Sequence, residues 1–565
     1  MQEFVYYNSK GIDFPLSQNI LVTDKLEEDS ESDYIVSNTK DVKAEIIADE
    51  IDFYINNTKD PLSSIIKNVE KLYELNAERF DLAQDMVYSA DISNKVLLVC
   101  TKEQKTEILK LIDPSEFDLF QVNEEIIKNI EGHIGNLTVT VEDGDKEVDL
   151  KVDQIIWFDE KELGMKQSGC FDPLKSSISD ILSLIRANIT SFEYKKFTTY
   201  DKTICQYHER REEICGKCAE VCPTVAIVKD DEHKHLEFSQ IDCHGCGGCV
   251  SVCPSGAIDY APANKESMFE MSKYYRNQIP LIIPEKMNVS SLNVELKENV
   301  LPFKIEGEKY LHEATLLTLL QESGSQVVFY TDFLSKGTKD SISILNQVYQ
   351  AKYKKDAILL AMTEDELISA LEEVDFIEGS RYLVNQEDTR KREVFAIRLS
   401  NIVGNDDLGT VTTGEHVHYA KVNVNESTCT LCLSCVGACN VNALIADTSD
   451  NSLRINPSLC TSCGYCEVSC PEKDCLTIER DVIHLNPTWF KEEVLAKDTL
   501  FACVECGKEF ATTKAIEKIA SIMAPIFKSD PVKERTLYCC EDCKPKIMME
   551  SYMKNRDKYK SPTGV

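Results

Sequence analysis

Long apolar runs are missing from this chain: no stretch approaches the roughly 20 consecutive apolar residues that cross a bilayer. The N-terminus, Met1–Val5, has neither a basic start nor an apolar core, so no secretory signal is expected. Positive charge is also scarce, since 62 Lys and Arg stand against 96 Asp and Glu for a formal net charge of -34. We therefore expect a soluble, cytoplasmic protein that phosphate backbones repel, which argues against a nucleic-acid partner.

Recognisable nucleotide-binding motifs are missing as well. The sequence contains no G-x-G-x-x-G fingerprint and no phosphate loop. Residues 263–415 contain no cysteine, and residues 1–200 contain only two isolated ones, Cys100 and Cys170. The other 22 of the 24 cysteines lie in the remaining segments, most of them with the spacing of metal ligands, which requires a reducing compartment rather than a disulfide framework.

Sixteen of the cysteines form two copies of one spacing pattern. The first copy is Cys205-x9-Cys215-x2-Cys218-x3-Cys222-Pro223 followed by Cys243-x2-Cys246-x2-Cys249-x3-Cys253-Pro254. The second copy is Cys429-x2-Cys432-x2-Cys435-x3-Cys439 followed by Cys460-x2-Cys463-x2-Cys466-x3-Cys470-Pro471. Seven of the eight cysteines recur at a constant offset of 217 positions, and Cys429 falls opposite Glu212. This regularity indicates an internal duplication.

The spacing has a chemical reason. Three cysteines two residues apart can bind three irons of a cubane cluster from one tight loop, while the fourth, three residues on and before Pro, ligates the neighbouring cluster. Each copy therefore predicts two [4Fe–4S] clusters with crossed ligation. The four predicted ligand sets are Cys205, Cys215, Cys218 and Cys253; Cys222, Cys243, Cys246 and Cys249; Cys429, Cys432, Cys435 and Cys470; and Cys439, Cys460, Cys463 and Cys466.

Both copies resemble the bacterial two-cluster ferredoxin domain. The resemblance extends to the small residues and strand that follow the x3 cysteines, Val225-Ala226-Ile227 and Gly256-Ala257-Ile258. It implies two ferredoxin-like modules whose clusters transfer electrons. Structural zinc knuckles also use C-x2-C pairs, but a zinc site needs four ligands and not an unbroken run of three with a fourth at x3-Pro.

Two positions depart from the repeat. Glu212 stands where the repeat predicts cysteine, and Cys205 lies seven residues earlier. We favour Cys205 as the ligand, because a thiolate suits cluster iron better than a carboxylate and a longer loop costs little closure entropy. A Glu212 ligand and a three-iron cluster remain the alternatives. Asn440 replaces the usual Pro after Cys439 and is expected to affect potential or stability rather than the number of clusters.

A separate cysteine group lies near the C-terminus. Cys503-x2-Cys506 and Cys540-x2-Cys543 predict a tetrahedral four-sulfur site suited to structural zinc, with no open position for a substrate. Cys539 competes with Cys540 for the fourth position. A single rubredoxin-like iron is the alternative to zinc, followed by a fifth cubane.

The remaining segments predict a multidomain α/β and α+β chain. In residues 1–200 the apolar spacing predicts helices at 61–75 and 77–88, a strand at 95–100 and a hairpin around Asp143-Gly144-Asp145. Between residues 280 and 373, strands and helices alternate, which predicts a parallel, doubly wound sheet. The expected domains are an N-terminal α/β domain (1–200), a first ferredoxin module (201–262), an α/β domain (263–415), a second ferredoxin module (416–490) and a zinc-binding domain (491–565).

The order of strands and helices in residues 263–415 is weakly similar to the delta subunit of methyl-viologen-reducing hydrogenases, a small electron-transfer module. Because this segment has no cysteine, any cluster of that family cannot be transferred to it. A flavin at the carboxyl edge of the sheet is conceivable, although no motif supports it and a structural spacer is favoured.

Three functions fit these features. The first is a polyferredoxin that carries single electrons through four clusters. The second is a subunit or partner of a larger oxidoreductase, such as formate dehydrogenase or hydrogenase, with the substrate site elsewhere. The third is an assembly or maturation factor that uses its zinc domain to hold a client. Catalysis by this chain alone is not expected, and its acidity suits a redox partner with a basic surface.

Overall fold

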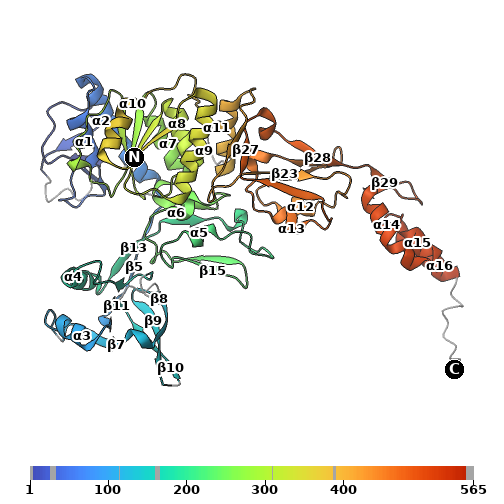
Figure 1. Ribbon diagram of the computed structural model, residues 1–565, viewed down its shortest axis with the longest axis horizontal. Coiled ribbons are helices and arrows are strands. Elements are labelled where there is room, and N and C mark those ends of the chain that lie inside the picture. Colours follow the sequence, from blue (N-terminus) through green and yellow to red (C-terminus); the bar gives the residue numbers. More distant parts are fainter. Residues whose placement is uncertain are drawn as a thin grey trace. The chain divides into compact units, whose positions relative to one another are not determined.

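The structure is a computed structural model that describes residues 4–25, 34–113, 115–144, 146–158, 166–307, 309–385 and 390–554. It divides into two compact units (Figure 1). The first comprises Met1–Ile402 with Gly414–Val417, and the second comprises Val403–Thr413 with His418–Val565. Both units mix helices with several sheets, as expected. None of the helices in the described ranges combines the length and the apolar character needed to cross a membrane.

The first unit begins with a parallel sheet in the order β2-β1-β3-β4 and two helices. Their bounds are β1 (Phe4–Tyr7), β2 (Leu21–Thr23), β3 (Tyr34–Ser37), β4 (Ile46–Ile47), α1 (Asp49–Asn57) and α2 (Leu62–Leu82). The prediction of separate helices at 61–75 and 77–88 is wrong, because α2 is continuous and Val87–Ala90 forms strand β5. No Gly or Pro interrupts α2, and buried Asn76 at its middle donates to Glu50 Oε1 of α1 at 2.7 Å.

A second parallel sheet, in the order β12-β11-β6-β7, shares no strand with the first. The elements of this region are α3 (Lys102–Ile108), α4 (Ile178–Asn188), β6 (Lys95–Val99), β7 (Asp118–Val122), β8 (Ile127–His133), β9 (Asn136–Asp143), β10 (Lys146–Val152), β11 (Gln154–Trp157), β12 (Cys170–Phe171) and β13 (Phe192–Lys195). Strand β6 is buried on both faces: Leu98 packs in one core with Ile181 of α4, and Leu97 packs in another with Val139 of β9. The expected hairpin is present as β9 and β10, and Asp145 lies outside the described residues.

Residues 1–200 were expected to form one α/β domain, and they contain two separate parallel sheets. The first of these packs toward the following α/β region, since Arg79 of α2 donates to Lys304 O at 2.9 Å. The domain boundaries themselves stay a prediction.

The central sheet confirms the expected parallel alternation, in the order β19-β18-β20-β21. Its elements are β18 (Ile279–Pro284), β19 (Val300–Ile305), α8 (Glu313–Ser323), β20 (Val327–Tyr330), α9 (Lys336–Tyr353), β21 (Ile358–Ala361) and α10 (Glu364–Glu373). All residues of β18 and β19 are buried, as helices on both faces of a parallel sheet require. Two further helices, α7 (Lys265–Tyr274) and α11 (Lys391–Val403), were not predicted.

The duplication is visible in the strands and helices of the two modules. The first module contains β14 (Thr198–Tyr200), α5 (Lys217–Glu220), β15 (Ile227–Asp230), β16 (His235–Phe238), α6 (Gly248–Ser251) and β17 (Ile258–Tyr260). The second contains β23 (Ala420–Val424), α12 (Ser434–Ala438), β24 (Leu444–Asp447), β25 (Ser452–Ile455), α13 (Tyr465–Ser469) and β26 (Leu476–Arg480). Strands β15 and β24 start at Ile227 and Leu444, which are 217 positions apart, and their hairpins have the same register. The cysteine offset is therefore also a structural offset.

The first module packs closely on the central sheet. Lys309 donates its backbone N–H to Cys246 O at 2.9 Å, in the middle of a cysteine loop. A Cβ atom at Gly247 would lie 2.4 Å from the Cβ of Tyr310, and one at Gly337 would lie 2.6 Å from Ser251 Oγ. Glycine at these positions lets the cysteine loop and helix α6 approach the central helices at backbone distance.

The second unit ends in a small helical region. Strands β29 (Leu500–Ala502) and β30 (Glu509–Thr512) precede α14 (Thr513–Phe527), α15 (Pro531–Thr536) and α16 (Cys543–Lys554). Helix α14 includes Pro525 and ends at Phe527. Pro525 has no amide to donate to the carbonyl four residues back, and the helix ends two residues after it.

We predict that Gly337→Ala destabilises the protein even though alanine favours a helix by roughly 0.5–1 kcal/mol over glycine. The added Cβ meets Ser251 Oγ and Val252 Cγ1 of the first module, and such overpacking typically costs about 1–3 kcal/mol. The measurement is thermal unfolding of the full chain. Lys339→Ala, at an exposed position of the same helix, is the control and is expected to change stability by less than about 0.5 kcal/mol. A stabilised Gly337→Ala variant would contradict the packing.

Candidate metal centres

Three of the four cysteine loops turn at the same two positions, directly before and after the second cysteine. These residues have positive φ: Gly245 (67°) and Gly247 (78°), Leu431 (51°) and Leu433 (60°), and Ser462 (58°) and Gly464 (80°). A residue with a side chain adopts this conformation at a cost of about 1–2 kcal/mol, so Leu431, Leu433 and Ser462 are held there by the surrounding fold. Such turns direct successive backbone N–H groups to one side and favour an anionic centre.

The thiols gather in the sets that the spacing predicts in the first module. Burial raises the pKa of Cys249 well above its ordinary value, and the thiols that raise it further are, in order, Cys243, Cys246, Cys222 and Cys253. The first three are its predicted cluster partners. The fourth belongs to the neighbouring set, so the two sets lie side by side.

The second module repeats this arrangement. Burial raises the pKa of Cys435 to about 12, and its predicted partners Cys429, Cys432 and Cys470 raise it next. Burial also raises the pKa of Cys466, followed by Cys460, Cys463 and Cys439 and then by Cys435 of the adjoining set. Buried thiols that repel one another in this way are stabilised as thiolates only by a cation at their centre.

The structure brings Cys205, and not Glu212, to the remaining set. The thiols acting on buried Cys218 are Cys253, Cys215, Cys249 and Cys205. Cys205 is buried, whereas the Glu212 side chain is exposed. In this loop Gly216 has an extended φ of 163°, so the turn differs from the other three, which agrees with a ligand that comes from an earlier position in the chain. Cys205 remains a predicted ligand with this geometry in its favour.

The donor sets fit [4Fe–4S] clusters. A cavity in the first module is lined by one complete predicted set, Cys222, Cys243, Cys246 and Cys249, and by apolar side chains that include Val221 and Phe238. All 24 cysteines are free thiols, so none is committed to a disulfide. Four thiolates around an apolar cavity match the chemistry of an iron–sulfur centre and would exclude water from it.

A buried ion pair lies behind Cys253. Lys391 Nζ is 3.2 Å from Glu313 Oε2 and donates to Cys253 O at 3.1 Å, while Arg392 Nε donates to Pro254 O at 2.7 Å. Burial alone would raise the pKa of Glu313, but Lys391, His312 and Arg392 outweigh it and lower that pKa to about 2. The Glu313 carboxylate is therefore charged, and Lys391 places a cation next to a predicted cluster ligand.

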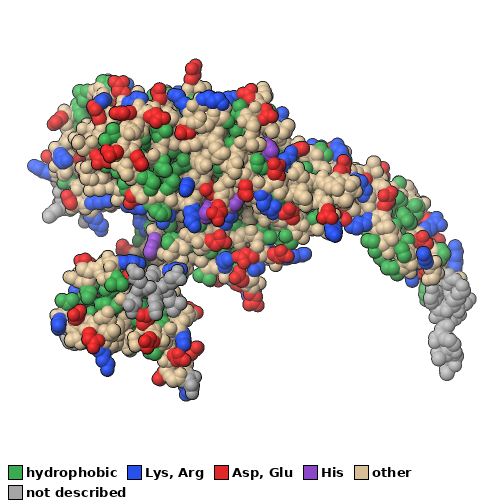
Figure 2. Space-filling view, viewed as in Figure 1, with side chains coloured by type: hydrophobic (Ala, Val, Ile, Leu, Met, Phe, Trp, Pro, Cys, Tyr) green, Lys and Arg blue, Asp and Glu red, His purple; other side chains and the backbone are tan. Residues whose placement is uncertain are grey.

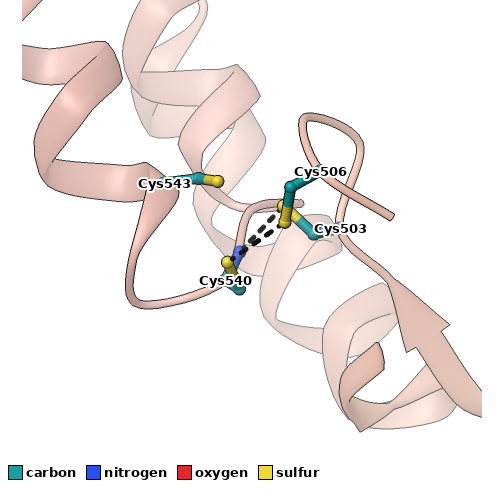
Figure 3. Close-up of side chains that lie close together, drawn as sticks. All are labelled: Cys503, Cys506, Cys540 and Cys543. Atoms are coloured by element: carbon teal, nitrogen blue, oxygen red, sulfur yellow. Dashed lines mark hydrogen bonds between the residues drawn. The ribbon is translucent and has the colours of Figure 1, made fainter. Parts of the chain in front are cut away.

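The C-terminal cysteines form a compact site of a different kind. The sulfur atoms of Cys503, Cys506, Cys540 and Cys543 lie within 4.8 Å of one another (Figure 3). Cys503 and Cys506 come from the turn between β29 and β30, and Cys543 begins α16. Cys506 Sγ and Cys540 Sγ are 3.7 Å apart, close to the roughly 3.8 Å that Zn–S bonds of about 2.3 Å impose on a tetrahedron.

Backbone amides also favour a thiolate at this site. The Cys540 N–H donates to Cys503 Sγ at 3.3 Å (Figure 3). Burial would raise the pKa of Cys503, but this amide and those of Glu505 and Cys506 outweigh it and lower the pKa to about 6. The competing ligand, Cys539, instead donates to Arg535 O at 3.3 Å and is not part of the four-sulfur group. The geometry fits one metal ion, and zinc or iron as its identity stays a prediction.

The other three cysteines lie outside these sets. Cys100 packs in the core with Val96 and Leu98. Burial raises the pKa of Cys170 to about 12, and no other cysteine contributes to that shift. Cys475 is buried beside Cys429 and Cys470, two predicted ligands of the second module.

We predict opposite shifts in reduction potential when the two members of the buried pair are neutralised. Lys391→Met removes a cation beside Cys253 and leaves Glu313 unpaired, so the potential of the nearest cluster should fall. Glu313→Gln leaves the cation unopposed, so that potential should rise. EPR-monitored redox titration measures both. Removing one partner of a buried pair can destabilise a protein by about 3–5 kcal/mol, so shifts of the same sign in both variants would indicate loosened packing and contradict the charge effect.

We predict that Cys506→Ser removes one metal ion per chain while Cys539→Ser retains it, since only Cys506 belongs to the four-sulfur group. Metal analysis of purified variants for zinc and iron, together with sulfide, separates this ion from the clusters, because a mononuclear site contains no sulfide. Equal metal loss in both variants would show that Cys539 is a ligand.

Comparison with known families agrees with this geometry. Two segments, residues 213–269 and residues 421–471, match family models described as 4Fe-4S dicluster domains. The first match begins after Cys205 and the second includes the whole second cysteine copy. Neither reaches the central sheet, so the similarity to a hydrogenase delta subunit stays a prediction, and a search of curated proteins found no significant match. The chain thus carries two 4Fe-4S dicluster ferredoxin domains, one in each compact unit, which supports an iron–sulfur electron-transfer role.

Proposed function

We propose that this chain is a polyferredoxin that carries single electrons through four [4Fe–4S] clusters, as a subunit or partner of a larger oxidoreductase. The observation that carries the proposal is the grouping of the thiols: each set of four adjoins a second set in the same module. When bound, each cluster takes up and releases one electron. Adjoining sets would keep each pair of clusters close enough for electrons to pass between them.

The protein's own residues prepare these centres. Most of the thiols are at least partly buried, which limits the access of water, and the left-handed turns at Leu431, Leu433 and Ser462 align backbone N–H groups in a way that favours an anionic centre. Both features adjust the reduction potential, burial by disfavouring added negative charge and the N–H groups by favouring it. The first module is also contacted by the cation of Lys391, which lies outside the repeated cysteine segments and donates to Cys253 O. The two modules are therefore proposed to differ in potential.

The partner side of the proposal rests on exposure and charge. Cys432 is exposed, as is the neighbouring Leu433 at 38%, so one predicted cluster of the second module lies near the surface. The net charge of -34 favours a partner with a basic surface at that point. Formate dehydrogenase and hydrogenase are the partner classes we propose, because such enzymes exchange single electrons with ferredoxin modules.

Anaerobic EPR of the dithionite-reduced chain tests the proposed function. Two clusters in one module should couple magnetically and broaden each other's signals, and addition of an oxidised partner enzyme should return the signals to the silent state. Isolated, uncoupled signals, or clusters that never reduce, would overturn the electron-carrier proposal.

A second candidate, an assembly or maturation factor, is favoured by the C-terminal helices. Ile519, Ile522 and Ile526 of α14 are between 49% and 66% exposed and follow the spacing of one helix face, and Met549 and Met553 of α16 are exposed as well. Figure 2 shows hydrophobic side chains gathered over this part of the chain. If the isolated second unit holds a client enzyme while the clusters stay redox-inert, this function replaces the first.

We predict that Cys205→Ser converts one cluster of the first module to a three-iron form or loses it, since Cys205 completes the set of Cys215, Cys218 and Cys253. EPR of the oxidised protein detects a three-iron cluster directly. Glu212→Gln, which alters an exposed side chain, is the matched control and should leave four-iron signals unchanged. The reverse pattern would make Glu212 the ligand.

A further inference from the structure

A cavity of about 540 Å³ lies where the first module meets the central helices, within the usual range of about 300–1,000 Å³ for small-molecule sites. Residues of β14 and β17 line one side, and the first turns of α7, α8 and α11 line the other. Helix α8 follows strand β19, so its first turn lies at the carboxyl end of the central sheet. The dicluster module covers this end of the sheet. In doubly wound folds, ligands bind beyond the carboxyl ends of the strands.

The cavity combines an apolar wall with basic groups. Ile204, Met268 and Phe269 supply apolar surface. The basic residues are Lys265, Arg390 and Lys391, and each stands at the start of a helix, where the helix dipole also favours an anion. Three carboxylates line the cavity as well, namely Asp201, Asp259 and Glu266. Asp259 accepts the backbone N–H of Lys265 at 3.1 Å, and Asp201 accepts that of Thr203 at 2.9 Å.

His312 provides a fixed hydrogen-bond donor in the same wall. Its Nδ1 accepts the backbone N–H of Ala314 at 3.2 Å, so the ring proton of the neutral form lies on Nε2. Burial, and then the charge of Lys391, lower the pKa of His312 to about 3, which keeps the ring neutral. A neutral imidazole that lines the cavity with a set tautomer is a donor for a carbonyl or ring nitrogen.

The cavity adjoins a predicted cluster. Tyr200 and Gly256 line it, and the pKa of Tyr200 is raised by burial and then by Cys205, which lies against its hydroxyl. Lys391 lines the cavity and donates to Cys253 O at 3.1 Å. A ligand here would lie against the set of Cys205, Cys215, Cys218 and Cys253.

We propose that this cavity binds a flavin nucleotide. This choice of ligand rests on the proposed electron-transfer function. A carrier beside a centre that moves electrons singly has to accept them one at a time, which flavins do and nicotinamides, which take a hydride, do not. A flavin nucleotide brings a phosphate, for which Lys265 and Arg390 supply basic groups, whereas a quinone has no anionic group.

The experiment measures flavin binding by the full-length, anaerobically purified chain. Acid-released flavin is quantified by chromatography with fluorescence detection, and FMN affinity is then measured by equilibrium dialysis, which the absorbance of iron–sulfur clusters does not disturb. We expect about one FMN per chain and a loss of at least about tenfold in affinity in Lys265→Met/Arg390→Met, because both substitutions remove charged hydrogen-bond donors to the phosphate. Riboflavin, which has no phosphate, should bind the wild type more weakly and be insensitive to the two substitutions.

Lys355→Met, an exposed lysine outside the cavity, is the matched control and should bind FMN as the wild type does. No FMN binding, or equal binding by the double variant and the wild type, would overturn the site. Iron and sulfide measured on the same samples separate the two proposals. Intact clusters without FMN binding refute only the flavin site, whereas FMN binding by a chain that holds no clusters refutes the electron-carrier function.

Discussion

The structure depends on the burial of cysteine thiols in groups of four. Thiols in this arrangement raise each other's pKa, so without a cation at the centre each group is held in its neutral form. The loops nevertheless hold leucine and serine in the left-handed region, a conformation that the fold maintains against an intrinsic cost. Metal binding and folding of the two modules are therefore linked, as in other small metal domains.

The central α/β region does more than separate the two modules. Its helices contact a cysteine loop of the first module at backbone distance, through glycines at 247 and 337 and through the amide of Lys309. It also supplies the buried cation of Lys391 beside Cys253. The two modules have nearly the same internal structure but different neighbours. The central helices contact the first module, whereas Thr512 and Lys518, at the start and within helix α14, contact the second at Thr430 and Glu472. A duplicated chain can in this way diverge in electrochemistry while its cysteine spacing stays constant.

The features that sequence could predict were those encoded locally. The spacing of the cysteines is a local pattern, and it predicted which thiols lie together. The alternation of apolar strands and helices likewise predicted the elements of the central sheet from β18 to α10. Helix α11 was missed because its inward side includes Arg398, which is fully buried with Glu322 at 3.2 Å and breaks the apolar stripe. The pairing of Lys391 with Cys253 joins residues 138 positions apart, and no local pattern records such a contact. The division of residues 1–200 into two sheets was missed for the same reason, since strand pairing is set by tertiary contacts.

The most direct test of the account is Mössbauer spectroscopy of the ⁵⁷Fe-enriched, anaerobically purified chain, combined with sulfide analysis. Four cubanes predict about sixteen iron and sixteen sulfide per chain, with all cluster iron in [4Fe–4S] signatures. Any iron in the C-terminal four-sulfur site would appear as a separate mononuclear component. A content near eight iron, or cysteines oxidised to disulfides in place of clusters, would contradict the assignment of two cluster pairs to the duplicated thiol sets.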